Sequence, residues 1–268
     1  MYRNLGKKRV NLTRFKKNPS KEDISSNSLR RGGSLYQNDV MKISCIILFI
    51  TGLVFSARAQ QSEVRALNSF QGVRVSEAID VYLKKGDKES VRLEVTGTDL
   101  SDILTEVAGT TLKIHMRQGD YRGKRTVKAY VTYKQLDKIS ASSASNVFSE
   151  GPIKTQSMGI NVSSAGSVEV SIDAAESVSI DASSAGDVVL EGKARSLEIE
   201  ASSAGDIDAY NLESEMVNAR VSSAGSAKVN VTKELEAHAS SGGSIRYRGN
   251  PLKTNTDSSS GGSVKKTN

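Results

Sequence analysis

Residues 183–190 read Ser-Ser-Ala-Gly-Asp-Val-Val-Leu, four small residues followed by one polar residue and an apolar stretch. The same element, Ser-Ser-small-small-polar, occurs seven times. Its copies begin at Ser142, Ser163, Ser183, Ser202, Ser222, Ser240 and Ser259, at spacings of 18 to 21 residues. Self-similarity at a nearly fixed period is the sequence signature of a repeat protein. We therefore expect a stack of similar structural units.

Apolar and polar residues alternate with period two between these elements, as in VEVSID at 168–173 and LEIEA at 197–201. This pattern predicts β-strands with one buried face. A unit of about twenty residues cannot bury that face alone, whereas stacked units can. The sequence therefore predicts an all-β, single-stranded parallel β-helix (solenoid) with about twenty residues per turn. We expect Gly166, Gly186, Gly205 and Gly225 to take positive φ at its corners, because glycine has no Cβ.

The segment before the repeats also has the alternation of β-strands. We predict that residues 60–135 form a β-rich N-terminal cap and that 136–268 form the β-helix. Residues 76–83, SEAIDVYL, resemble 183–190 and could form an irregular early turn of the same solenoid. Thr98 to Val107 could hold one short helical turn.

The first 59 residues have the character of a leader. Residues 41–59 combine a lysine, an apolar run and an Ala-Arg-Ala site, which predicts a signal peptide cleaved before Gln60; a membrane anchor is the alternative reading. Residues 1–40 are polar and basic. They are either a disordered extension or a stretch upstream of a true start at Met41. A chain that starts at Gln60 has no cysteine, which excludes thiol chemistry and thiolate metal sites.

The formal charge of +7 is concentrated at the N-terminus. Residues 1–40 carry ten basic and three acidic side chains, whereas residues 61–268 carry 25 basic and 27 acidic ones. The main part of the chain is thus nearly neutral. A nucleic-acid-binding domain is not expected, because such domains carry a basic surface.

One pair of acids is a candidate for chemistry. Asp187 and Asp206 occupy the same position in successive repeats, so stacking should bring them about 5 Å apart. Two close carboxylates could share a proton, bind Ca²⁺ or act in glycoside hydrolysis. The alternative is a position that simply tolerates solvated polar residues. No histidine pair has metal-ligand spacing, and we predict neither a metal site nor a cofactor.

A basic segment, residues 117–128, is the second candidate. Arg117, Arg122, Lys124 and Arg125 lie around two glycines that suggest a hairpin loop. These side chains could bind an acidic polysaccharide or a lipid headgroup. A solvated loop is the alternative.

Several stretches resemble a known family. FQGVRVSEAIDVYLKKGD (70–87), SVRLEVTGTD (90–99) and TEVAGTTLKI (105–114) resemble the start of the DUF2807 family. The triplet Gly159-Ile160-Asn161 is similar to the one that gives its head GIN domain its name. The resemblance implies a right-handed β-helix in an adhesin head, found mainly in exported proteins of Bacteroidetes.

These observations lead to one functional hypothesis and two alternatives. We expect an exported cell-envelope protein, in the periplasm, on the cell surface or secreted, that acts as a non-enzymatic adhesion, binding or scaffold module. Its expected partners are glycans or other envelope components, with no membrane-spanning domain after cleavage. One alternative is a polysaccharide-active enzyme that uses Asp187 and Asp206. The other is a solenoid that associates with copies of itself.

Overall fold

The structure, a computed structural model, describes residues 60–121 and 123–267. The predicted extension 1–40 and signal peptide 41–59 lie outside the described residues, as does Arg122. The described chain is all β apart from one short 3-10 turn, η1 (Leu100–Asp102), which falls in the segment expected to hold a helical turn. None of its segments is a helix that could cross a membrane.

The N-terminal part is a mixed set of seven strands. They are β1 (Gln61–Ala66), β2 (Gly72–Val75), β3 (Asp80–Lys85), β4 (Ser90–Thr96), β5 (Ile103–Ala108), β6 (Thr111–Met116) and β7 (Thr126–Tyr133). Here β1 pairs antiparallel with β4, β4 with β7, and β5 with β6.

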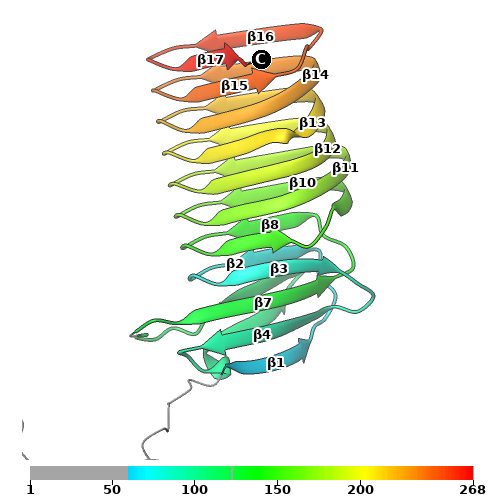
Figure 1. The fold of residues 1–268 in the computed structure, drawn as a ribbon, viewed down its shortest axis with the longest axis vertical. Coiled ribbons are helices and arrows are strands. Elements are labelled where there is room, and N and C mark those ends of the chain that lie inside the picture. The colour runs from blue at the N-terminus through cyan, green and yellow to red at the C-terminus, as the bar shows by residue number, and fades with distance from the viewer. Residues whose placement is uncertain (1–59, 122, 268) are drawn as a thin grey trace, which may run out of the picture. The chain divides into compact units, whose positions relative to one another are not determined.

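The remaining ten strands form the repeats. They are β8 (Lys138–Ala141), β9 (Asn146–Ser149), β10 (Ile153–Val162), β11 (Ser167–Ala182), β12 (Asp187–Ala201), β13 (Asp206–Val221), β14 (Ser226–Ala239), β15 (Ser244–Arg248), β16 (Lys253–Ser258) and β17 (Ser263–Lys266). All pairings among them are parallel (Figure 1). The predicted parallel β-solenoid is therefore confirmed.

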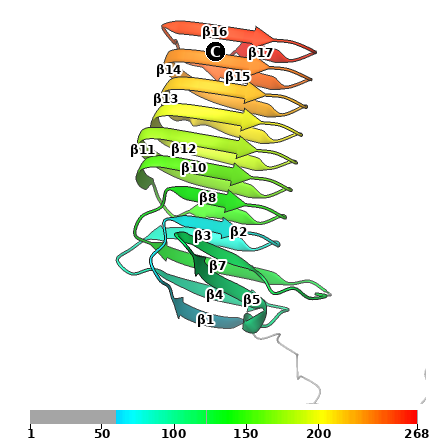
Figure 2. The same cartoon turned by 180° about the vertical axis from the view of Figure 1, so that it is seen from behind.

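The strands build two faces that pack against each other. Each long strand bends midway and contributes to both faces, so that tight turns line one edge and broad bends line the other (Figures 1 and 2). Face A consists of β1, β4, β7, β3, β9, the first halves of β11 to β14, β15 and β17. Face B consists of β5, β6, β2, β8, the second halves of β10 to β14, and β16.

The core lies between the faces and follows from the alternation. One inward column contains Val168, Val188, Ile207, Ala227 and Ile245, which pair in register and are fully buried. Adjacent rungs, meaning successive turns of the solenoid, lie about 4.8 Å apart, so each apolar side chain packs on its equivalents above and below.

Residues 72–85 form the first rung. The turn between β2 and β3 has positive φ at Glu77 and Ala78, and β2 and β3 pair in parallel with β8 and β9. The expected early turn of the solenoid is thus present. The chain then places β6 and β7 on the other side of this rung, against β2 and β3.

The tight turns correct one expectation. Positive φ falls on the second serine and the alanine, +49° at Ser203 and +62° at Ala204, and not on Gly205. The amide of Gly205 donates to Ser202 O at 2.9 Å, which closes a two-residue turn of the type common in hairpins. The same holds at Gly166, Gly186 and Gly225, none of which has positive φ.

The glycine is required by close approach instead. A Cβ on Gly205 would lie 2.3 Å from Ala182 O, the carbonyl that ends the strand of the preceding rung. Two positions depart from glycine. Ser145 carries a Cβ at the equivalent position and its hydroxyl donates to Val75 O at 3.2 Å, so this turn accommodates a small side chain against β2. Ile79 occupies the position in the first rung, below which no such turn stacks.

Two substitutions separate these explanations. Gly205→Ala should lower the free energy of unfolding by about 1–3 kcal/mol, because its Cβ collides with backbone that cannot move alone. Ala204→Gly should stay within about 1 kcal/mol of the wild type, since relief of the positive φ offsets the added freedom of the unfolded chain. Urea denaturation measures both. A larger loss for Ala204→Gly than for Gly205→Ala would show that turn conformation, not close approach, selects the glycine.

Candidate functional site

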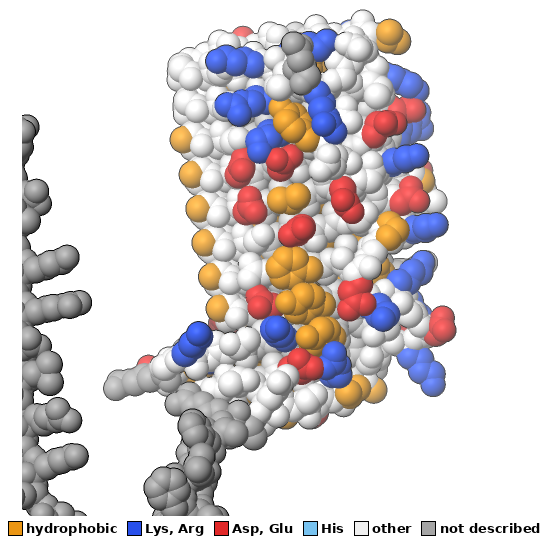
Figure 3. All heavy atoms as spheres, in the orientation of Figure 1, with side chains coloured by type: hydrophobic (Ala, Val, Ile, Leu, Met, Phe, Trp, Pro, Cys, Tyr) orange, Lys and Arg blue, Asp and Glu red, His pale blue; other side chains and the backbone are white. Residues whose placement is uncertain are grey.

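Three aromatic side chains stand in a row on the outer surface of face A. Tyr130 on β7, Tyr82 on β3 and Phe148 on β9 are in register, and their ring centroids are 5.1 and 5.4 Å apart. The guanidinium of Arg92 lies 4.0 Å from the Tyr130 centroid and covers the end of the stack. We call these three rings the aromatic rib. Figure 3 shows that apolar side chains form a row along the middle of the visible face.

The rib is half-buried and stiff. Each ring stacks on its neighbour, so Tyr82 has both faces occupied. The Tyr130 hydroxyl donates to Glu94 Oε2 at 3.3 Å, which fixes its orientation. A ligand on this surface would therefore find both faces of Tyr82 covered and would meet the edge and the hydroxyl of this ring.

The same column continues over the next six rungs with five charged side chains and one valine. Glu169, Val189, Asp208, Lys228, Arg246 and Lys265 follow Phe148 on successive rungs. We call these six residues the charged column. Lys228 Nζ lies 2.7 Å from Asp208 Oδ2, and this hydrogen bond raises the pKa of the Lys228 ammonium.

The two predicted acids are brought together. Asp187 and Asp206 are direct register partners at the start of β12 and β13 on face A. Partial burial, followed by the charge of Asp206, raises the pKa of the Asp187 carboxyl, and a 3.5 Å hydrogen bond from the Ser167 hydroxyl opposes the rise. In the part of the chain that the structure describes, no group of three His, Cys, Asp or Glu residues could hold a metal ion.

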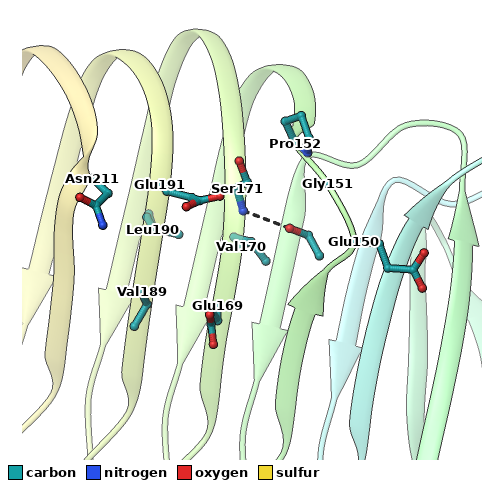
Figure 4. Close-up of a pocket in the computed structure, with 11 residues that line it drawn as sticks. Glu150, Gly151, Pro152, Glu169, Val170, Ser171, Val189, Leu190, Glu191 and Asn211 are labelled. Atoms are coloured by element: carbon teal, nitrogen blue, oxygen red, sulfur yellow. Dashed lines mark hydrogen bonds between the residues drawn. The ribbon is translucent and has the colours of Figure 1, made fainter.

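Two hollows lie near the bend edge of face A. The first, about 280 Å³, is lined by Glu150, Pro152, Glu169, Glu191 and Asn211, among others (Figure 4). In it Ser149 Oγ accepts a hydrogen bond from the Ser171 amide at 3.0 Å. The second, about 360 Å³, shares the loop 150–152 and adds two lysines of β3, Lys84 and Lys85. Neither hollow is lined by Asp187 or Asp206.

The predicted basic loop lies elsewhere. It follows β6 and leads to β7, but β6 pairs with β2 and β5 on face B, whereas β7 pairs with β3 and β4 on face A. The loop is therefore a crossing between faces, and the expected hairpin is wrong.

Two of its described basic side chains contact neighbouring groups of the N-terminal part. Arg117 donates to Ser101 O at 3.3 Å, and Arg125 lies 5.3 Å from the Tyr121 ring centroid. Lys124 is exposed. The loop is far along the solenoid from β12 and β13, so the structure does not join it to the aspartate pair.

Sequence reasoning missed the aromatic rib. A signal was present, because the aromatic residue follows an inward apolar residue in DVYL (80–83), KAYV (128–131) and NVFS (146–149). The stacking order was not visible, because β7 inserts beneath β3 although it comes later in the chain.

With this geometry in view, the family can be assigned. A family model described as "Putative auto-transporter adhesin, head GIN domain" (DUF2807) matches residues 69–251. The chain belongs to this family. The matched range includes the rib, the aspartate pair and most of the charged column.

Solved structures share the fold. A "putative adhesin" from Bacteroides fragilis has a TM-score of 0.69 and 21% identity, with 79% of this chain and 98% of that chain covered. A "putative lipid binding protein" from Parabacteroides distasonis and a "putative adhesin" from Parabacteroides merdae each have a TM-score of 0.60, with 18% and 17% identity and the same coverage. No curated protein matches the chain.

The aspartate pair makes a pH prediction. Because the pKa of Asp187 is raised on folding, the native state gains protons there, and its ionisation opposes folding at neutral pH. Asp187→Asn should therefore raise the urea midpoint at pH 7 and leave it unchanged once the pH falls below the ordinary aspartate range.

A second variant checks the cause. Asp206→Asn should lower the pKa of Asp187 in an NMR titration, because it removes the neighbouring charge. An unchanged Asp187 titration would contradict the close approach of the two carboxylates.

Proposed function

We propose that the protein is an exported, non-enzymatic binding module of the cell envelope, and that it contacts glycans or similar envelope polymers along face A. Membership of an adhesin family supports the class of function. The observation that carries the proposal is the in-register row of half-buried aromatic side chains on the outer surface of face A, Tyr130, Tyr82 and Phe148. A column with one side chain per rung suits a repeating polymer better than a small molecule.

The aromatic rib and the second hollow are the proposed contact region. Tyr82 and Phe148 offer apolar edges, while Lys84, Lys85 and Glu150 offer donors and acceptors for hydroxyl and acidic groups. Because the rings are already stacked, little side-chain freedom would be lost on binding. Multivalent contact along the face can then raise a weak affinity per site.

The absence of enzymatic activity is also part of the proposal. The aspartate pair is not among the residues that line the two hollows of face A. Glycoside hydrolysis needs two carboxyl groups on opposite sides of the scissile bond. Asp187 and Asp206 instead stand side by side on one flat surface.

Binding tests the proposal directly. Purified protein should co-sediment with an insoluble glycan fraction of the cell envelope. Phe148→Ala and Tyr82→Ala should each weaken binding at least about tenfold, which corresponds to about 1.4 kcal/mol. Glu198→Ala on face B serves as the control and should bind like the wild type.

Two results would overturn it. One is unchanged binding by rib variants whose thermal midpoints match the wild type, or no binding to any envelope glycan. The other is release of reducing ends from the same glycan, with loss of that activity in the Asp187→Asn, Asp206→Asn double variant, which would support the enzyme instead.

The location is tested on intact cells. Protease treatment should release a chain whose N-terminal sequence starts at Gln60. A chain processed at Gln60 but protected from protease would contradict surface adhesion and favour a periplasmic role.

A further inference from the structure

The charge of the solenoid changes sign along its axis. Residues 150–215 carry thirteen acidic and three basic side chains, whereas residues 244–267 carry five basic and one acidic. On face A the acidic side chains gather in the middle rungs and basic ones toward the C-terminal rungs (Figure 3). One face thus carries a negative band and a positive band side by side.

Within the charged column the two acids and two of the three bases stand at symmetric positions. The midpoint lies between Asp208 and Lys228, which are direct register partners. One rung outward on either side stand Val189 and Arg246, and two rungs outward stand Glu169 and Lys265. Rotation by half a turn about this midpoint places every acid of the column opposite a base.

Among the described residues, the outer charged members of the column, Glu169, Arg246 and Lys265, have no ion-pair partner. Arg246 and Lys265 are register partners, so two like charges stand on adjacent strands. Like charges directly opposite each other destabilise a sheet, and an opposing surface of the other sign would relieve this repulsion.

We propose that face A docks against face A of a second copy. The two solenoids run antiparallel, and the two-fold axis lies in the interface between the rungs of Asp208 and Lys228. Glu169 then faces Lys265 of the second copy, and the two Asp208–Lys228 pairs form a ring of four charges. Such an interface is self-complementary, as a two-fold dimer requires.

An exposed apolar side chain fits the same arrangement. Val189 is 37% exposed on face A, unusual among the valines of the solenoid. The axis places it opposite Arg246 of the second copy, whose aliphatic stem can cover it while the guanidinium reaches Asp187 in the adjacent column.

The size of the interface predicts its strength. Six rungs at about 4.8 Å and five residues at about 3.3 Å give roughly 480 Å² per copy, or about 950 Å² in total. This is at the low end for specific association, and the contacts are mainly charged. The dimer should therefore be weak and should dissociate as salt screens the charges. The aromatic rib of each copy remains uncovered, beyond the last described rung of the other copy.

Sedimentation equilibrium of the purified protein tests the proposal. At about 20 mM salt the weight-average mass should rise with concentration from the monomer mass toward twice that value, and at about 500 mM salt it should stay near the monomer mass. Lys265→Glu and Glu169→Lys should each weaken association at least about tenfold. The double variant with both changes should restore it, because each copy then presents the exchanged pair.

A matched control keeps the net charge change but moves it to the other face. Lys138→Glu on β8 of face B should associate like the wild type. The proposal fails if the wild type is a monomer at low salt, if Lys265→Glu and Lys138→Glu have equal effects, or if the double variant does not recover. Circular dichroism of each variant confirms that folding is retained.

Discussion

The close approach of backbone at the tight turns is the constraint on which the rest of the structure depends. The turn amide of Ala185 donates to Ser203 O at 3.1 Å, and that of Ala204 donates to Ser223 O at the same distance. This spacing leaves no room for a Cβ at Gly205 beside Ala182 O. The turns therefore fix the rungs in register, and every column of side chains on the two faces inherits that register.

The regular stacking places the candidate contact residues in rows on an open face and not in a deep pocket. Because equivalent positions align, a single substitution in one repeat changes one member of a long row. Along the solenoid axis, face A carries first an aromatic segment, then an acidic band and then a basic band. Different segments of one face can then serve different contacts.

Much of this could be predicted from sequence. The SSAG period and the alternation of apolar residues gave the parallel solenoid, the inward column from Val168 to Ile245 and the contact of Asp187 with Asp206. The reason is physical, since each repeat contacts mainly its neighbours in sequence. The rib could not be derived, because its order depends on β7 lying beneath β3. The reason for glycine at the tight turns could not be derived from sequence either, because the carbonyl that a Cβ would meet belongs to another repeat.

The position of residues 72–85 between β6–β7 and β8–β9 has a consequence for folding. Later rungs can be added one at a time, each on a neighbour about twenty residues away, which is a local and rapid process. The first rung instead needs partners up to residue 149 before both of its edges are paired. When the chain emerges N-terminus first, the edges of β2 and β3 that pair with β8 and β9 stay unpaired while some sixty further residues follow. Unpaired strand edges invite aggregation. The N-terminal segment, and not the repeats, therefore sets how long strand edges stay unpaired during synthesis.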